Sequence, residues 1–471
     1  MSSQRYDIGM VGLGVMGRNL VLNIADHGFT AAGYDRDLSK VQSLRTEAES
    51  RSIFGAENMQ EFVASLRVPR LVMMLVPAGP PVDTVIRDLI PYLAPGDVIV
   101  DGGNSYYKDT NLRAAALAQK GFAFLGVGIS GGESGARHGP SIMPGGPRDA
   151  YERVRPIFEA VAARAEGDPC VAYVGPGSAG HYVKMVHNGI EYGLIRLIAE
   201  SYALMRLALG MADGELTPVY DRWNQGLLNS YLIEITARIF QQRDPITGKP
   251  LVDVILDEAK QKGTGKWTSE DAMDLQVPLP TIDVSVAMRN LSVLKSQREL
   301  ASRILSGPTT AFDGNRDIFL KQLEDALYTG FIVTFAQGMA LLSVASSAYE
   351  YSLDQETVAR IWRGGCIIRA ALLENIRQAF HAQPDLPNLM LAPFFASELT
   401  KRQDALRAIV NRAATLGIAV PALMTALAYF DAYRSAWMPA NLVQAQRDYF
   451  GAHTYERVDT KGVFHTEWEK G

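Results

Sequence analysis

Four polar or ionisable side chains share one side of an otherwise apolar stretch, residues 180–193, "GHYVKMVHNGIEYG". The stretch is predicted to be helical, and at about 100° per residue Lys184, His187, Asn188 and Glu191 fall within one sector. A solvated stripe would carry many lysines and glutamates, whereas this one has a single residue of each type. A lysine and a glutamate about two turns apart can bracket a small ligand, one taking a proton and the other giving one. That chemistry requires burial and neighbouring charges to lower the lysine pKa.

A glycine-rich motif of the GxGxxG type forms a second candidate site. The motif permits a tight turn, close approach of the backbone to a pyrophosphate and close packing of helix on strand. The helix that follows offers free N–H groups and a positive dipole end to phosphates. The motif follows an expected strand, and Asp35 stands 18 residues beyond its last glycine, at the end of the next strand. We therefore expect a dinucleotide site built from Gly12, Leu13, Gly14, Val15, Met16 and Gly17, with Asp35 beside it.

Two further loops follow expected strands. "DGGNS", residues 101–105, places Asn104 where its amide offers both a donor and an acceptor. "ISGGESGARHGPSIMPGG", residues 129–146, offers the Ser130 hydroxyl and the N–H groups of Gly131 and Gly132 to an anion. Ligands of open parallel sheets bind at the carboxyl ends of the strands, so these loops are expected to share one site.

The elements that must position these residues divide the chain into three parts. Residues 1–177 alternate short apolar runs with helical stretches, which predicts a doubly wound, Rossmann-like α/β domain. Residues 178–434 are mostly helical in pattern and are expected to form a large all-helical domain. Residues 435–471 lose the helical period but are rich in aromatics, which favours a tail docked on another surface. The candidate strands are 6–13, 31–35, 70–76, 97–103, 122–129 and 170–175, and the candidate crossover helices include 81–94 and 109–120.

Composition limits the classes of function. The formal net charge of −5 argues against a protein that binds nucleic acid as a whole, although a local phosphate pocket remains compatible with it. The two cysteines, Cys170 and Cys366, form no CxxC motif and suit a reducing cytoplasm. No secretory signal is recognised, and we expect no membrane span.

Seven stretches carry a resemblance to a known family over residues 6 to about 468. They are "GLGVMGRNL", "DGGNS", "SGGESGARHGPSIMPGG", "GHYVKMVHNGIEYG", "QKGTGKWT", "WRGGCIIRA" and "PANLVQAQRDYFGAHTYE". The chain resembles the decarboxylating 6-phosphogluconate dehydrogenases. The resemblance implies oxidation of the 3-hydroxyl of 6-phosphogluconate, loss of CO₂ from the 3-keto acid, and protonation of the enediol to ribulose 5-phosphate, without a metal.

The resemblance also implies roles for individual residues. Lys184 matches the general base and Glu191 the general acid. Because the family's tail inserts into the partner subunit, a homodimer is implied, with Arg447 and His453 reaching the other chain's site. The residues that match substrate-binding positions are Asn104, Ser130, Gly131, Gly132, His187, Asn188, Tyr192, Lys262, Thr264, Arg289, Arg447 and His453, of which Tyr192, Lys262, Arg289 and Arg447 match the phosphate clamp.

The chain departs from the family pattern on the cofactor side. Asp35-Arg36-Asp37 stands where the family has Asn-Arg-Thr, and Val76-Pro77-Ala78 stands where it has Val-Lys-Ala. A carboxylate at this position can accept hydrogen bonds from a ribose 2′-hydroxyl, and it repels a 2′-phosphate. Arg36 acts in the opposite sense. We therefore expect the enzyme to use NAD better than NADP, or at least both.

Two alternative interpretations stay open at this point. The first is another β-hydroxyacid dehydrogenase, of the 3-hydroxyisobutyrate type, which would not need the cations Lys262, Arg289 and Arg447. The second is a non-catalytic nucleotide-binding protein on the same fold, against which the retained Lys184 and Glu191 argue because packing does not require them.

Overall fold

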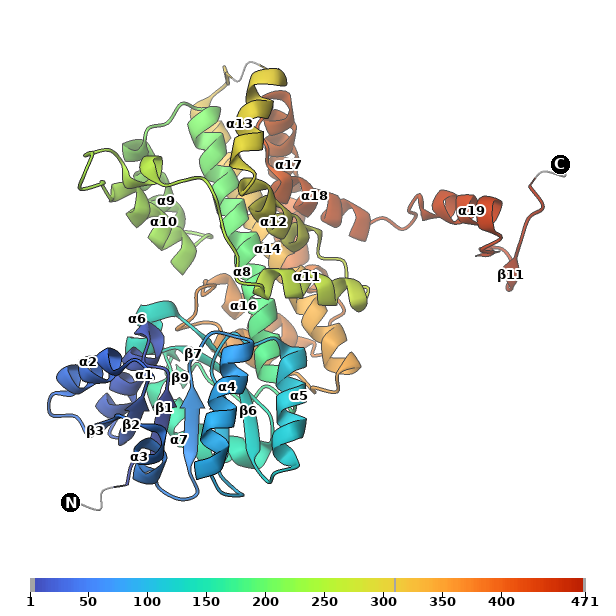
Figure 1. The fold of residues 1–471 in the computed structure, drawn as a ribbon. Coiled ribbons are helices and arrows are strands. Elements are labelled where there is room, and N and C mark those ends of the chain that lie inside the picture. The colour runs from blue at the N-terminus through green and yellow to red at the C-terminus, as the bar shows by residue number, and fades with distance from the viewer. Residues whose placement is uncertain (1–4, 309–310, 469–471) are drawn as a thin grey trace. The chain divides into compact units, whose positions relative to one another are not determined.

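The computed structural model describes residues 5–308 and 311–468. Its contacts divide the chain into two compact units, Met1–Ala426 and Leu427–Gly471. The first unit contains a sheet with flanking helices, followed in the chain by a bundle of long helices (Figure 1). The expected boundary at residues 177/178 falls just before the first long helix, and a domain division there stays a prediction.

The sheet has seven strands in the order β3-β2-β1-β4-β5-β6-β7. The pairs from β3 through β6 are parallel and β7 is antiparallel to β6. Because the strand order reverses between β1 and β4, a ligand crevice is expected at the carboxyl ends of these two strands. The strands are β1 (Ile8–Val11), β2 (Ala31–Tyr34), β3 (Ile53–Ala56), β4 (Leu71–Met74), β5 (Val98–Asp101), β6 (Ala123–Ser130) and β7 (Ser141–Gly145).

Helices cover both faces of the sheet, which gives two apolar cores. Successive residues of one strand enter different cores: Met10 packs in one and Val11 in the other. This arrangement explains the uninterrupted apolar runs of the central strands. The covering helices are α1 (Val15–Asp26), α2 (Leu38–Ala48), α3 (Met59–Ser65), α4 (Pro80–Leu89) with the short turn η1 (Ile90–Tyr92), α5 (Tyr107–Ala118), α6 (Gly132–His138) and α7 (Arg148–Val161).

The strand predictions differ from the structure in several places. Residues 170–175 form no strand and contribute only isolated bridges, Ile142 to Val171 and Gly145 to Gly175. Strand β3 was missed because a glycine interrupts its short apolar run, and β7 was missed because Pro144 and Gly145 weaken its strand signal. A small hairpin of β8 (Arg164–Ala165) and β9 (Asp168–Pro169) was also missed.

The helical region of the first unit is built on two long helices. α8 (Ala179–Leu207) runs from the sheet into this region, where α14 (Arg316–Ala348) packs along it (Figure 1). Close approach is possible because a Cβ on Gly193 would meet Thr334 at 2.5 Å and one on Gly338 would meet Ile190 at 2.4 Å. The other elements are α9 (Asp213–Asn224), α10 (Tyr231–Gln241), η2 (Leu251–Val254), α11 (Thr264–Asp274), α12 (Pro280–Ser292), α13 (Lys295–Ile304), α15 (Gln355–Ile361), α16 (Leu372–Ala382), η3 (Leu389–Leu391), α17 (Pro393–Thr415) and α18 (Pro421–Tyr433), which contains the boundary between the units.

The expectation about membrane spans overlooked one helix. α14 is long and apolar enough to cross a membrane by length and composition alone, and no other described helix passes that test. Within the structure, 67% of its apolar window is buried, which is typical of the core helix of a globular protein.

The second unit contains a helix that the sequence pattern did not reveal. α19 (Ala440–Gly451) forms where the helical period had been expected to end, and a hairpin of β10 (Tyr455–Glu456) and β11 (Val463–Phe464) follows it. The buried Asp448 carboxylate holds the unit together, accepting bonds from the Thr454 and Thr466 N–H groups and from the Trp468 ring. Burial of Asp448 raises its pKa, but these bonds and one from His465 outweigh that effect and bring the pKa to about 2.

Candidate active site

The N-terminal half of α8 lies directly on strand β6. A Cβ on Gly128 would stand 2.5 Å from the Cβ of Lys184, so glycine in the strand makes room for the lysine. His181 fixes the helix from the same side, because its ring contacts the Thr110 hydroxyl at 2.7 Å and the Asp101 carbonyl oxygen at 3.0 Å. Lys184 is therefore held at the end of the sheet with only 5% of its surface exposed.

His187 occupies the centre of the polar sector. Its Nε2 lies 3.2 Å from the Ser130 hydroxyl, and its Nδ1 lies 3.2 Å from the Asn188 Oδ1 and 3.9 Å from the Glu191 carboxylate. Burial, with the nearby Lys184 charge, sets the His187 pKa well below its ordinary value, so the ring is neutral. Because the Asn188 oxygen can only accept, we assign the ring proton to Nδ1, which leaves Nε2 to accept from Ser130.

The pKa values of the lysine and the glutamate shift in opposite directions. Burial lowers the Lys184 pKa, and the negative charge of Glu191 partly opposes this. Burial raises the Glu191 pKa, opposed by the charges of Lys184 and Arg289. Both shifts favour the neutral forms, which are the forms a general base and a general acid need before reaction.

The residues Arg289 and Lys262 and the first turn of α11 belong to the region around Tyr192, next to Glu191 on α8. The Arg289 guanidinium of α12 lies over the Tyr192 ring, 3.6 Å from its centroid. Gly265 packs against that ring so closely that a Cβ would stand 2.4 Å away. Thr264, at the first turn of α11, is buried, and Lys262 just before it is exposed. This corner carries the positive charge expected of a phosphate-binding site.

The loops after β5 and β6 complete the sheet side of the site. Asn104 follows β5 and its side chain is exposed. Gly131 has a φ of 125°, and a Cβ there would stand 2.4 Å from the Gly365 carbonyl oxygen. Gly132, with a φ of 61°, begins α6 and is exposed. Glycine is therefore required at position 131 by both conformation and space.

The glycine-rich loop after β1 has the geometry that a dinucleotide needs. Gly12 has a φ of 97°, and a Cβ on Gly17 would stand 1.9 Å from the Gly12 carbonyl oxygen. Gly14 begins helix α1 without a side-chain cap, and a Cβ there would meet nothing within 4 Å. Leu13 is buried, while Val15 is exposed and Met16 half-buried. The helix N–H groups are thus left open for phosphate oxygens, so these residues fit a dinucleotide.

Asp35 is tied to the glycine loop. Its Oδ2 accepts from the Leu13 N–H at 2.8 Å and its Oδ1 from the Asp37 N–H at 2.9 Å. Asp37 caps α2 by accepting from the Ser39 N–H and hydroxyl. Lys40, which is not among the predicted cofactor-binding residues, approaches both acids, at 3.6 Å from Asp35 and 3.9 Å from Asp37. Arg36 is exposed, as is Pro77, and Val76 and Ala78 are half-buried after β4.

Arg447 and His453 belong to the second unit. Arg447 lies on α19, where its guanidinium donates to the Gln444 side chain at 2.9 Å. His453 follows the helix, its ring edge against Phe450 with centroids 6.1 Å apart. Both residues are exposed, and their participation in the site stays a prediction.

A loop between α15 and α16 contributes contacts to the site. Its residues 362–370, "WRGGCIIRA", are one of the stretches that resemble the family, but the sequence did not indicate these contacts. The Ile367 N–H donates to the Ser130 hydroxyl at 3.4 Å, and the Trp362 ring packs edge-on against His187 at 5.4 Å. The Cys366 thiol is buried beside Lys184, and burial raises its pKa to about 12.

A buried carboxylate beneath the site was also missed. Asp271 of α11 accepts hydrogen bonds from three tyrosine hydroxyls, those of Tyr107, Tyr182 at 2.5 Å and Tyr349 at 2.7 Å. Tyr107 begins α5, just after the Asn104 loop, and Tyr182 precedes Lys184 on α8. Asp271 thus connects α11 and α8, which carry predicted site residues, to the start of α5, which follows the Asn104 loop. Only the tertiary structure brings these side chains together, so no local pattern could have indicated them.

Two family models match the chain. Residues 7–175 match the NAD binding domain of 6-phosphogluconate dehydrogenase, and residues 180–468 match the 6-phosphogluconate dehydrogenase C-terminal domain. Together they cover both the glycine loop and the polar sector of α8.

Individual proteins match over the full length. The chain is 51% identical over 471 residues to a Bacillus subtilis protein named 6-phosphogluconate dehydrogenase, NADP(+)-dependent, decarboxylating, with 100% of each chain covered. It is also 51% identical to the decarboxylating 6-phosphogluconate dehydrogenase of Synechococcus elongatus, with 99% of this chain and 100% of the relative covered. A solved Plasmodium falciparum 6-phosphogluconate dehydrogenase, studied apo, with NADP+ and with 6-phosphogluconate, superposes with a TM-score of 0.93 at 42% identity, covering 98% of this chain and 100% of that one.

Proposed function

The chain belongs to the 6-phosphogluconate dehydrogenase family, and on that premise we propose that it converts 6-phosphogluconate to ribulose 5-phosphate and CO₂ with hydride transfer to NAD(P)+. The observation that carries the proposal is the polar sector of α8. Lys184 and Glu191 flank a neutral His187, and burial shifts the pKa values of the lysine and the glutamate towards neutrality. Packing alone gives no reason to bury these groups together.

The proposed chemistry moves one proton through Lys184. The bound dinucleotide supplies the hydride acceptor. The Nζ of neutral Lys184 takes the proton of the 3-hydroxyl as carbon 3 of the substrate is oxidised to a ketone. The resulting ammonium then polarises the ketone oxygen, so the electrons of the broken carbon–carboxylate bond flow towards it and CO₂ leaves. Glu191 finally donates its proton to the carbon that lost CO₂. One proton then passes from the Lys184 ammonium to the Glu191 carboxylate, which restores both neutral forms for the next turnover.

The remaining site residues hold the substrate. Ser130, His187 and Asn188 offer a hydroxyl, a ring and an amide group. His187 lies between the other two, 3.2 Å from the Ser130 hydroxyl and 3.2 Å from the Asn188 oxygen. Arg289 and Lys262 supply positive charge for the phosphate. Phosphate binding far from the reacting carbons gives orientation, which is also why a non-phosphorylated hydroxy acid is the less suitable substrate for this site.

We infer that NAD is used in addition to NADP. Asp35 and Asp37 place two carboxylates where a 2′-phosphate would bind, and Pro77 replaces the lysine of the family pattern. Arg36 and Lys40 supply two cations in the same region, and Lys40 approaches both acids. The balance of charges supports use of both dinucleotides, with NAD favoured to the extent that Asp35 contacts the ribose.

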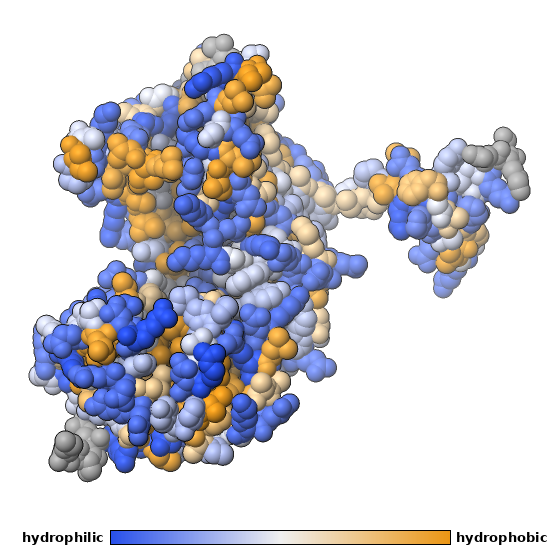
Figure 2. Space-filling view, in the orientation of Figure 1, coloured by the Kyte–Doolittle hydropathy of each residue, from blue (hydrophilic) through white to orange (hydrophobic). Residues whose placement is uncertain are grey.

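We further propose a homodimer in which the tail completes the partner's site. The second unit exposes Trp437, Leu442 and Phe450, which is a large apolar surface for a short segment. In the first unit, apolar surface gathers around α10 and α13 (Figure 2). Ile246, in the loop after α10, and Leu300 and Ile304 of α13 are exposed. A second copy of the chain is the occupant proposed for these surfaces.

Subunit complementation tests this arrangement. A Lys184→Met chain and an Arg447→Ala chain are each expected to be inactive, and mixing them with subunit exchange should restore activity in those heterodimer sites that gain both residues. No recovery after verified exchange would show that the tail acts within its own chain.

The proposed location is the cytoplasm. Both cysteines are free and buried, as in proteins of reducing compartments. Fractionation of the producing cells, with enzyme activity as the marker, would test the location.

The direct test of the function is a steady-state assay with 6-phosphogluconate and either NAD or NADP. We expect equal amounts of reduced dinucleotide, CO₂ and ribulose 5-phosphate. 3-Hydroxyisobutyrate serves as the control substrate for the related hydroxyacid dehydrogenases. Turnover of that acid in place of 6-phosphogluconate, or dinucleotide binding without turnover, would contradict the proposal.

A further inference from the structure

The loop of residues 362–371, between α15 and α16, reaches the active site only through its backbone and its buried side chains. The Ile367 N–H contacts Ser130, which in turn bonds to His187. The Gly365 carbonyl oxygen accepts from the Ser141 N–H at 2.9 Å and lies against Gly131. The position of this loop therefore sets the position of the Ser130 hydroxyl.

The loop is packed too tightly to adapt by small shifts. Gly365 has a φ of 66°, and a Cβ there would stand 2.6 Å from both Ala163 and the Gly139 carbonyl oxygen. A Cβ on Gly364 would stand 3.0 Å from the Cys170 sulfur. Contacts this close transmit displacement from one side of the loop to the other.

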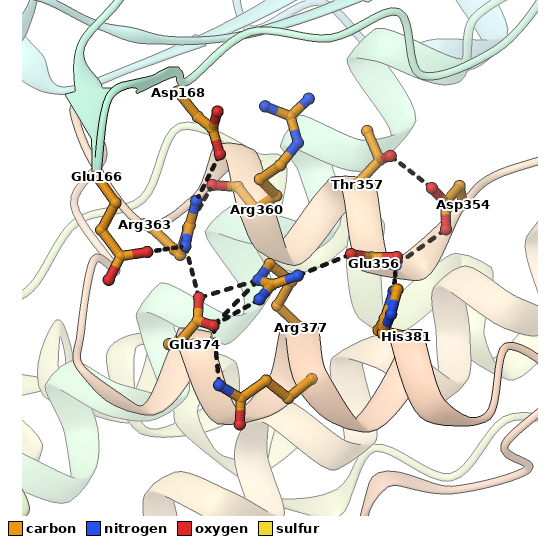
Figure 3. A network of polar contacts seen from close by, with 11 residues as sticks. Glu166, Asp168, Asp354, Glu356, Thr357, Arg360, Arg363, Glu374, Arg377 and His381 are labelled. Atoms are coloured by element: carbon orange, nitrogen blue, oxygen red, sulfur yellow. Dashed lines mark hydrogen bonds and ion pairs between the residues drawn. The ribbon is translucent and has the colours of Figure 1, made fainter.

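Arg363 extends from the same loop towards a network of charged residues (Figure 3). Its guanidinium lies 2.8 Å from Glu166 and 3.4 Å from Asp168, both on the β8–β9 hairpin, and 2.5 Å from Glu374 on α16. Only 8% of its side chain is exposed, although Glu166 and Asp168 are mostly exposed. Arg363 thus links a hairpin of the sheet region to a helix of the helical region.

The loop is held at its other end as well. The Arg369 guanidinium stacks over the Tyr231 ring at 3.7 Å and donates to the Cys366 carbonyl oxygen at 2.7 Å. Arg363 and Arg369 both line a cavity of about 310 Å³, and none of the predicted site residues lines it. The ion pairs, hydrogen bonds and ring contact described for the two arginines involve none of the predicted substrate-binding residues.

We propose that Arg363 is a positioning residue for the reaction: its ion pairs to Glu166, Asp168 and Glu374 set the loop that orients Ser130 and, through it, His187. The inference rests on the proposed function. It assigns to Arg363 an effect on substrate binding that an ion pair with a purely structural role would not have.

The test is Arg363→Met in the full-length enzyme. Folding is expected to survive, because Glu374 keeps its pairs with Arg377 and the hairpin acids are exposed to solvent. We expect KM for 6-phosphogluconate to rise about five- to tenfold, because displacement of a positioning group weakens substrate orientation. KM for the dinucleotide should stay within about twofold of the wild-type value, since the contacts described for residues 362–371 do not involve the glycine-rich loop after β1.

Three further variants make the test specific. Arg363→Lys, which keeps the charge, should recover part of the loss, and Glu374→Gln should reproduce it in weaker form. His381→Gln is the matched control, because His381 ends the same network at Glu356 with 71% of its side chain exposed and does not contact the loop.

The outcomes separate the explanations. A lower active fraction, measured by dinucleotide-binding stoichiometry, with an unchanged sugar KM would show a merely structural role and overturn the inference. An equal rise in both KM values would do the same. If Arg363→Met does not fold, Arg363→Lys and Glu374→Gln decide by the same criterion. A wild type that does not turn over 6-phosphogluconate would instead refute the proposed function.

Discussion

Replacing Asp271 by asparagine would test how the elements of the site are held together. The Oδ1 atom accepts from the Tyr107 and Tyr349 hydroxyls, and Oδ2 accepts from Tyr182. An asparagine keeps the hydrogen bonds from Tyr107 and Tyr349 if its side-chain oxygen takes the Oδ1 position. Its NH₂ group then faces the Tyr182 hydroxyl and can only donate to it, so the Tyr182 proton loses its acceptor. The substitution therefore removes the charge-assisted part of all three hydrogen bonds and reverses the direction of the one to Tyr182.

The magnitude follows from these three bonds. A hydrogen bond to a charged group contributes about 1.5–3 kcal/mol and a neutral one about 0.5–1.5 kcal/mol, so the gross loss is roughly 3–5 kcal/mol. The carboxylate is buried with no cation bonded to it, and the neutral amide escapes part of that desolvation cost. We expect a net destabilisation of about 1–2 kcal/mol. Because α11 carries Thr264, the sugar KM should also rise about threefold while the dinucleotide KM stays constant.

Urea unfolding at one fixed protein concentration, followed by tryptophan fluorescence, provides the assay, with steady-state kinetics on the same samples. Asp274→Asn is the matched control, because Asp274 lies on the same helix and its pair with Lys108, at 3.4 Å, is on the surface. Equal shifts of the urea midpoint for the two variants would refute the reasoning, as would an asparagine variant as stable as the wild type.

Three other predictions concern proton transfer, the cofactor and the tail. Glu191→Gln should slow product protonation. It should also move the rising limb of the pH profile of kcat/KM to lower pH, because the negative charge of Glu191 raises the Lys184 pKa. A rising limb that moves to higher pH would contradict this electrostatic coupling of Lys184 and Glu191. Asp35→Asn with Asp37→Thr should shift the ratio of kcat/KM values towards NADP, and a wild type already strongly selective for NADP would refute the role of these acids. Deletion of residues 440–471 should abolish activity and weaken the dimer in sedimentation velocity, and an active truncated enzyme would exclude the tail from the site.

Periodicity and motif spacing were sufficient to predict that the polar sector of α8 and the glycine loop form as local structures, while the catalytic and binding roles of their residues stay predictions. The polar sector of α8 followed from 3.6-residue periodicity, and the structure places His187 within hydrogen-bonding distance of Asn188, next to Glu191. The glycine loop followed from its context between β1 and α1. Both signals are local, which is why sequence alone could carry them.

The residues that support the site were not predictable in the same way. Asp271 and its tyrosines come from helices far apart in the chain, and Arg363 meets acids nearly 200 positions earlier, with sequence separations of 197 and 195 to Glu166 and Asp168. A periodic pattern within one helix or strand cannot indicate contacts between residues so far apart in the sequence. Lys40 is different, because its position three residues after the α2 cap Asp37 could have been recognised as a cation near the cofactor acids.

The most direct test of the whole account is single-turnover hydride transfer in Lys184→Met. The enzyme, in excess over 6-phosphogluconate, is mixed with the sugar acid at saturating dinucleotide, and the absorbance of the reduced nicotinamide is followed. Dinucleotide affinity should be unchanged, because Lys184 lies on α8 and not on the glycine loop. We predict that reduction falls by at least about 10³-fold, since the hydroxyl proton then has no base to accept it. Reduction at a rate near that of the wild type would contradict the assignment of Lys184 and, with it, the proposed mechanism.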